Sequence, residues 1–258
     1  MTVQMLFYEN AVAVSAARHA GCSVEVRGYA FCQKVNSVPL AAVEFRSAAS
    51  EYPIVFVDRG EVVLPVAVLG LRREENLLVS DAGNWQGRYI PAFVRRYPFV
   101  FSSTRDDKQF VLCVDEAFAG FNREGRGEPL FSAGQPSPYV GRVLRFLQEY
   151  RAQSLRTGAF CRRLKDLGLL EPVQARFTVG DAAVALSGFS RVNRERLKAL
   201  GGDQFGDLAH SDELELLYLH LHSLRNFEGL RSRLPIEPAV AGGCVPAGGD
   251  AGERVTVH

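Results

Sequence analysis

Two adjacent arginines, Arg95 and Arg96, are the residues whose type and spacing most directly permit chemistry in this sequence. They lie in the string RYIPAFVRRYPFVF, residues 88–101, among aromatic residues and prolines. On a short helix that begins at Pro91, adjacent side chains point about 100° apart, so we expect only one of the two arginines to turn inward. A buried guanidinium then needs a carboxylate partner, because an unpaired buried charge costs several kcal/mol.

Two glutamates are the natural partners for an inward arginine. Glu44 and Glu51 stand in or beside the string SEYPIVFVD, residues 50–58, which shares Tyr-Pro-x-Val-Phe with RRYPFVFSS, residues 95–103. In both strings the residue before proline favours extended geometry, which ends a helix and starts a strand. One interpretation is therefore a structural salt bridge that joins two similar units.

The second interpretation is a receptor for a small anion or carboxylate. A guanidinium fork binds carboxylates and phosphates through two parallel hydrogen bonds, and the aromatic side chains of the two strings and their surroundings would line such a site. The residues that this interpretation assigns to ligand or partner binding are Arg95, Arg96, Glu44, Tyr52, Tyr97 and Trp85.

Other residues with catalytic potential do not form a recognisable set. No G-x-S-x-G nucleophile motif occurs, and the five cysteines are scattered without a CxxC pair. His220 and His222 are two residues apart, so on a helix they point to different faces and cannot hold one metal ion together. The sequence therefore predicts no catalytic residue, no metal and no cofactor.

Composition limits the partners and the location of the protein. The chain has 258 residues, 47% hydrophobic, and its formal net charge of +1 gives no global attraction to nucleic acid. No segment reaches the roughly 20 apolar residues that span a bilayer, and the first 21 residues lack the basic start of a signal peptide. We expect a cytoplasmic protein, with the cell surface after export without a cleaved signal as the alternative.

The elements that must position these residues change character along the chain. Alternation predicts a strand over residues 22–31, and apolar runs rich in β-forming residues predict strands from Pro53, over 61–71, in NLLVS (76–80) and over 108–115. A helix is predicted over Glu44–Ser50 and a turn at 81–84. Pro65 within its strand indicates an edge strand or a bulge. The polar segment 122–140 is predicted as the main loop.

Helical spacing dominates the rest of the chain. A long helix is predicted after Pro138, a hairpin around Gly180-Asp181, and further helices after Asn193 and from Ser211 to Arg231. The predicted fold class is α+β, with a mixed or antiparallel β-rich N-terminal region packed with a helical C-terminal region. The predicted regions are 1–134, 135–234 as one unit with the first, and a disordered tail over 235–258.

Several strings together resemble the SapC family of bacterial proteins, from about His19 to Arg231. Asn76 belongs to the string LG-x-x-x-x-EN, and His220 matches a family histidine, which adds both to the candidate binding residues. The strings that carry the resemblance are VPLAAVEFRSAASEYPIVFVD (38–58), PVAVLGLRREENLLVSDAGNWQGRYIPAFVRRYPFVF (65–101), EPLF (128–131), LSGFSRVN (186–193) and ELLYLHLHSLRNFEGL (215–230).

The resemblance implies an association and no mechanism. The family takes its name from a locus connected with a bacterial surface layer, and members are similar to proteins encoded near outer-membrane receptors and halogenase-like flavoproteins. We therefore expect a non-enzymatic accessory or binding protein with a protein partner, linked to the cell surface, to uptake or to a modification pathway. The alternative is an enzyme or binding protein for a small anionic ligand, with Arg95 or Arg96, Glu44 and the tyrosines in the site.

Overall fold

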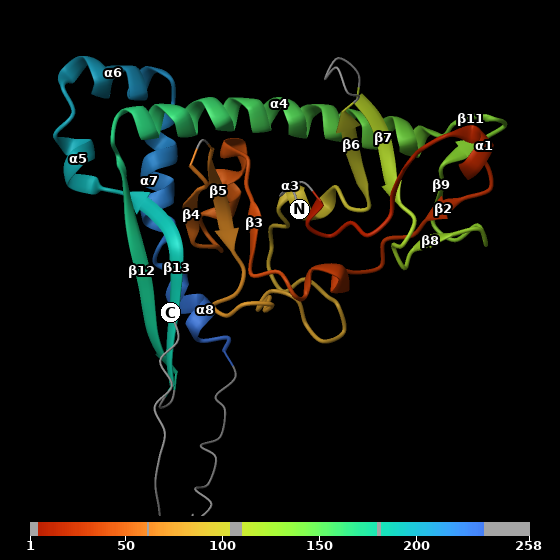
Figure 1. Cartoon of the computed structure of the whole chain (residues 1–258), viewed down its shortest axis with the longest axis horizontal. Helices are drawn as coiled ribbons and strands as arrows, with labels where there is room; N and C mark the ends of the chain where they lie inside the picture. Colours follow the sequence, from red (N-terminus) through yellow and green to blue (C-terminus); the bar gives the residue numbers. More distant parts are fainter. Residues whose placement is uncertain (1–4, 61, 104–109, 180–181, 235–258) are drawn as a thin grey trace, which may run out of the picture.

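A five-stranded antiparallel sheet forms one end of the molecule, in the order β12-β13-β4-β5-β3 (Figure 1). The structure is a computed structural model that describes residues 5–60, 62–103, 110–179 and 182–234. The predicted tail over 235–258 and the predicted turn at Gly180-Asp181 lie outside these residues. The strands of the sheet are β3 (Ser37–Pro39), β4 (Ile54–Asp58), β5 (Val63–Val68), β12 (Leu170–Val179) and β13 (Ala182–Val192).

Smaller sheets form the other end of the molecule. A three-stranded sheet has the order β1-β7-β6, a second has the order β8-β2-β9, and β10 pairs with β11. Each of these pairings is antiparallel, which agrees with the predicted α+β fold. Their strands are β1 (Ala11–Ala13), β2 (Ser23–Val24), β6 (Phe99–Ser103), β7 (Phe110–Asp115), β8 (Phe121–Asn122), β9 (Glu128–Pro129), β10 (Phe131–Ser132) and β11 (Gln135–Pro136).

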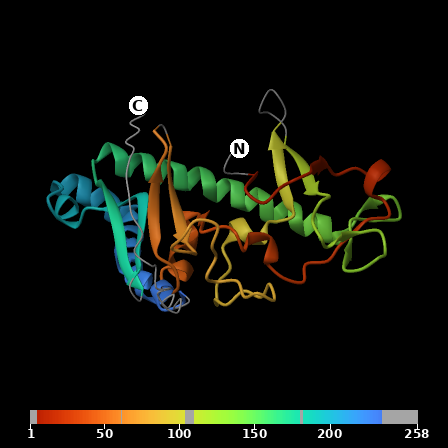
Figure 2. The same ribbon diagram turned by 60° about the horizontal axis from the view of Figure 1, so that its bottom comes forward.

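One long helix, α4 (Pro138–Asp166), runs past both ends (Figures 1 and 2). Ser137 caps its start by accepting a hydrogen bond from the backbone N–H of Val140, and Pro138 suits the first turn because its missing donor is not needed there. Leu147 packs in the smaller core cluster, whereas Phe160 and Leu164 pack in the larger one. The helix predicted after Pro138 is confirmed, and it connects the two clusters.

The remaining helices are short and lie mainly beside the five-stranded sheet. The helix predicted after Asn193 ends at Lys198, the one predicted over Ser211–Arg231 is divided after Ser223, and the helix over Gly202–His210 was not predicted. The chain contains α1 (Ala16–His19), α2 (Phe45–Ala48), α3 (Ala92–Arg95), α5 (Arg194–Lys198), α6 (Gly202–His210), α7 (Glu213–Ser223) and α8 (Asn226–Arg231), with 3₁₀ turns at Ala30–Cys32 and Ala42–Glu44. None of the described helices is both long and apolar enough to cross a membrane.

One predicted strand is shorter than expected and a second is wrong, because contacts between loops replace the ladder. The strand over 22–31 shortens to β2, and beyond it the Tyr29 N–H donates to Gly83 O, in a loop, at 2.7 Å. The string NLLVS forms only a single bridge, between Val79 and Trp85. Its start is a turn, in which the Asn76 side chain accepts a hydrogen bond from the Leu78 N–H at 2.9 Å.

Pro65 lies inside the sheet and not on an edge strand, which corrects the prediction. β5 is flanked by β4 and β3, and Phe56 is the partner of Pro65. The Pro65 carbonyl accepts a hydrogen bond from the Leu40 N–H just beyond the end of β3. The N–H and C=O of a residue point to the same side of a strand. The missing N–H of Pro65 would therefore point toward Leu40, which lies just after the end of β3, so no hydrogen bond within β3 is lost.

Candidate functional site

The loop of residues 85–92 is fastened to α2 and its flanks by two carboxylates. Glu51 accepts the backbone N–H of Arg88 at 2.6 Å and that of Tyr89 at 3.1 Å. Glu44 is only 5% exposed and accepts the backbone N–H groups of Ala41 and Ala92, each at 2.7 Å. Charge-assisted hydrogen bonds of this kind are stronger than neutral ones, so both glutamates hold backbone in place.

The hydroxyl of Tyr89 completes this network. It donates to the Glu44 carboxylate at 2.8 Å, and burial followed by the nearby Glu44 charge raises the pKa of Tyr89. The Tyr89 carbonyl accepts hydrogen bonds from the Tyr52 hydroxyl and from Trp85 Nε1. Three of the predicted site residues, Glu44, Tyr52 and Trp85, therefore meet around one loop residue.

The two arginines of the opening string take opposite directions. Arg96 is 3% exposed, and its guanidinium lies 4.1 Å from the ring centre of Phe93 and 5.3 Å from that of Tyr150. Arg95 is exposed, and its Nε donates to the carbonyl of Ile90 at 2.9 Å. The expectation that only one arginine turns inward is confirmed, and Arg96 is that residue.

The predicted salt bridge to Glu44 or Glu51 does not occur. In the described part of the chain neither glutamate makes an ion pair with an arginine, because their oxygens bind the backbone N–H groups of residues 41, 88, 89 and 92 instead. Arg96 packs on aromatic rings, a contact that attracts a guanidinium through the negative face of the ring.

Three other predicted site residues lie apart from this network. The Tyr97 hydroxyl donates to Asp115 at 3.1 Å, in a contact that ties β7 to the segment before β6. Asn76 donates to the carbonyl of Cys32 at 3.0 Å. His220 is fully buried between strands: its Nε2 accepts the Val192 N–H at 3.0 Å, and its Nδ1 donates to the Ile54 carbonyl at 2.8 Å.

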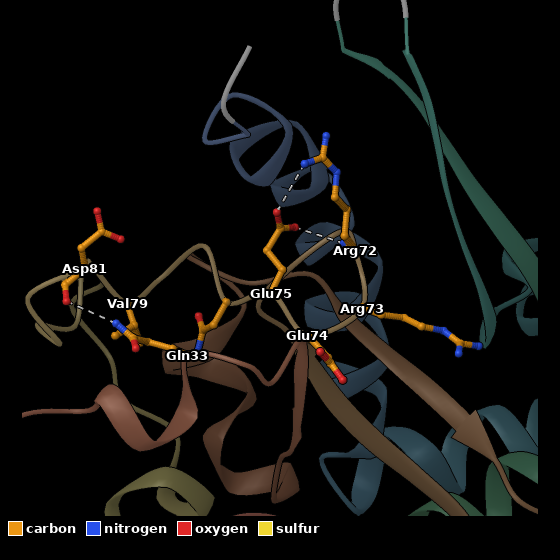
Figure 3. A pocket seen from close by; sticks show the side chains of 8 residues that line it. Gln33, Arg72, Arg73, Glu74, Glu75, Val79 and Asp81 are labelled. Carbon is orange, nitrogen blue, oxygen red and sulfur yellow. Dashed lines mark hydrogen bonds and ion pairs between the residues drawn. The ribbon is translucent and has the colours of Figure 1, made fainter. Parts of the chain in front are cut away.

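A hollow of about 540 Å³ borders the loop of residues 72–81, but its charged groups do not converge (Figure 3). Glu75 turns back to accept the backbone N–H groups of Leu71 and Arg72, and Arg73 and Asp81 point to opposite sides (Figure 3). Within the described ranges, no group of three His, Cys, Asp or Glu side chains could hold a metal ion.

A second hollow, next to Glu51, is lined by three arginines. Arg88 comes from the fastened loop, Arg225 directly precedes α8, and Arg233 follows it, so segments far apart in the sequence meet here. We name this the arginine hollow; its volume is about 620 Å³. Its other lining residues are Ser50, Glu51, Leu78, Gln86, Gly87, Asn226, Gly229 and Leu230.

The positions around the arginine hollow are fixed by hydrogen bonds. Asn226, at the start of α8, donates to the carbonyls of Ala49 at 2.8 Å and Tyr52 at 3.1 Å. A Cβ at Gly87 would lie 2.6 Å from the Glu51 carboxylate and 2.8 Å from the Tyr52 hydroxyl, so any larger residue there would displace these side chains. The loop and α8 are thus held against the same end of α2.

Sequence reasoning missed all three arginines of the hollow. Arg88 and Arg225 stand in strings that carry the family resemblance, WQGRYIP and HSLRNFE, and this was the available signal. Neither string contains a known binding motif. The two arginines come close only in the folded protein, where α8 packs against the end of α2. Arg95 and Arg96, by contrast, are adjacent in the sequence.

Comparison with known proteins gives one match. The family model described as SapC matches residues 14–230, which include Arg88 and Arg225 and end three residues before Arg233. No curated protein and no solved structure matches the chain.

Proposed function

Because the chain belongs to the SapC family, we propose that it acts as a non-enzymatic accessory protein that binds a small anionic ligand in the arginine hollow. The observation that carries this proposal is the convergence of Arg88, Arg225 and Arg233 on one hollow. Its volume of about 620 Å³ is in the range of small-molecule sites.

The charges of the hollow favour an anion. Among the described residues, none of the three arginines makes an ion pair, although Arg233 donates to the Leu77 carbonyl at 3.4 Å. The one carboxylate of the lining, Glu51, already accepts two backbone N–H groups. Like charges that line one hollow repel each other, and a bound carboxylate or phosphate would relieve that repulsion.

The hollow also has a fixed backbone around two of its arginines and no activated nucleophile among its lining residues. The backbone next to Arg88 is fastened by Glu51, and that next to Arg225 by Asn226. These bonds fix the backbone positions from which the two exposed arginine side chains extend, so less backbone freedom is lost when a ligand binds. Burial raises the pKa of the nearby Tyr52, which keeps its hydroxyl neutral. These features support binding over catalysis.

The test is calorimetric titration of the purified chain with citrate and with inorganic phosphate at low salt. We expect binding of at least one probe, weakened about tenfold or more in Arg225→Gln and in Arg88→Gln, since bidentate charged contacts contribute roughly 1.5–3 kcal/mol. Arg176→Gln, an exposed arginine on β12, is the matched control and should bind like the wild type. Equal affinity in all four proteins would refute the site.

The cellular role belongs to the same proposal. A partner connected with the cell surface, uptake or a modification pathway is what the family resemblance implies, and the four cysteines that the structure describes are free, buried thiols, which suits a reducing compartment. Pull-down from the native cell with metabolite profiling of the purified protein, alongside cell fractionation, tests the partner, ligand and location together. Recovery only from the surface fraction would overturn the cytoplasmic location.

A further inference from the structure

In β4 and β5, Val57 and Leu64 lie on the face of the sheet opposite to Phe56, which packs against α7 and α4. Neighbouring residues of a strand point to opposite faces, and the Phe56 ring lies 4.9 Å from that of His220 in α7 and 6.4 Å from that of Phe160 in α4. Val57, the next residue of β4, therefore faces the other side. Its cross-strand partner Leu64 shares that face.

That face carries an apolar trough. Val57, Leu64, Val66 and Pro39 form its floor, with Pro39 and Val66 paired across β3 and β5. Leu6 and Val35 are the apolar residues of its sides, and Leu6 is 43% exposed. The trough has a volume of about 320 Å³ and shares no residue with the arginine hollow.

Two cations border the apolar floor. Lys34 precedes β3 and Arg59 follows β4, and both are exposed. The register places Ser37 opposite Val68 at one end of β5, whereas β4 ends opposite Val63 at the other. Lys34 and Arg59 thus belong to strand ends on different sides of the trough, and neither has an ion-pair partner in the described part of the chain.

We propose that this trough binds an unbranched aliphatic carboxylate, with its chain along Val57, Leu64 and Val66 and its carboxylate at Lys34 or Arg59. An inorganic anion would leave the apolar floor exposed to water, and a neutral hydrocarbon would contact neither cation through a charge. A linear acid matches the floor with its chain and one of the two cations with its carboxylate. Each methylene group buried on the floor adds affinity. The long basic side chains can also pack their methylene groups on apolar surface while their charged ends reach the carboxylate.

The chain-length dependence of binding is the test. Calorimetric titration of the full chain with hexanoate, octanoate and decanoate, each below its aggregation concentration, should show Kd falling about fourfold per buried methylene until the trough is filled. At least one of Lys34→Gln and Arg59→Gln should raise Kd about threefold to fivefold at every chain length. Lys198→Gln, an exposed lysine on α5, is the matched control and should leave Kd unchanged.

Two further variants make the assignment decisive. Leu64→Gln should reduce the chain-length dependence, with circular dichroism confirming that the protein is folded; should it fail to fold, the two cation variants still decide. Arg225→Gln should leave the binding of these acids unchanged, because Arg225 lines the other hollow. Affinity independent of chain length, or weakened by Arg225→Gln and not by either cation variant, would overturn the trough as the site.

Discussion

Arg95 and Arg96 are neighbours in sequence with different structural roles. Arg96 is enclosed by the rings of Phe93, Tyr150 and Tyr8, and its guanidinium lies within 5.8 Å of each ring centre. Arg95 is exposed, with its guanidinium 5.2 Å from the ring centre of Phe146. The difference follows from the short helix α3, on which consecutive side chains cannot face the same way.

This contrast predicts unequal effects of alanine substitution. Arg96→Ala should lower the free energy of unfolding by about 2–4 kcal/mol, because it removes a buried side chain and its ring contacts. Arg95→Ala should lower it by about 0.5 kcal/mol, as for an exposed residue. Urea denaturation measures both values. Similar losses for the two variants would contradict the assignment of Arg96 as the structural arginine.

His220 predicts a pH dependence of stability. Its burial lowers the pKa in the folded protein from 6.5 to about 4, so the unfolded chain binds a proton that the folded chain excludes over this range. Because neutral His220 is the form that the folded protein accepts, the free energy of unfolding is highest above pH 6.5. It falls by roughly 3 kcal/mol in total as the pH falls toward 4. Urea denaturation at several pH values between 6.5 and 5 should show falling stability.

The matched variant is His220→Gln, whose amide can still accept from Val192 and donate to Ile54 and does not titrate. Its stability should fall less steeply over the same pH range than that of the wild type. An unchanged slope would assign the pH dependence to other groups.

At the scale of elements, helices and strands can be predicted from the sequence where one hydrophobic pattern continues along the whole element. β4, β7 and the long helix α4 follow their patterns, because alternation and helical spacing report which side of an element is buried. The short strand over Ser23–Val24 and the bridge at Val79 and Trp85 were mispredicted, since loop contacts such as Tyr29 to Gly83 do not show in local patterns.

The same reasoning explains what could be predicted of the candidate site. Glu44, Tyr52 and Trp85, which are among the candidates predicted from the sequence, all bond to Tyr89, whereas their role in binding a ligand stays a prediction. The arginine hollow was not foreseen, because Arg88 and Arg225 are brought together by the Asn226 contacts to Ala49 and Tyr52. Pairing across this sequence distance has no local signature.

At the scale of the whole molecule, α4 connects two core clusters. Leu147 is 2% exposed in the smaller cluster, and Leu164 is fully buried in the larger one, on the same uninterrupted helix. Unfolding of either cluster would remove the packing of half of α4. Because helix formation is cooperative and depends on such packing, we expect the two clusters to unfold together.

This predicts a single thermal transition in two variants. Leu147→Ala and Leu164→Ala should each lower the free energy of unfolding by about 2–5 kcal/mol, the cost of a large core truncation. In both, far-ultraviolet circular dichroism and the fluorescence of Trp85, the one tryptophan of the chain, should report the same midpoint. Trp85 packs against the larger cluster, so in Leu147→Ala a loss of helix signal before the fluorescence changes would show that the two ends fold independently.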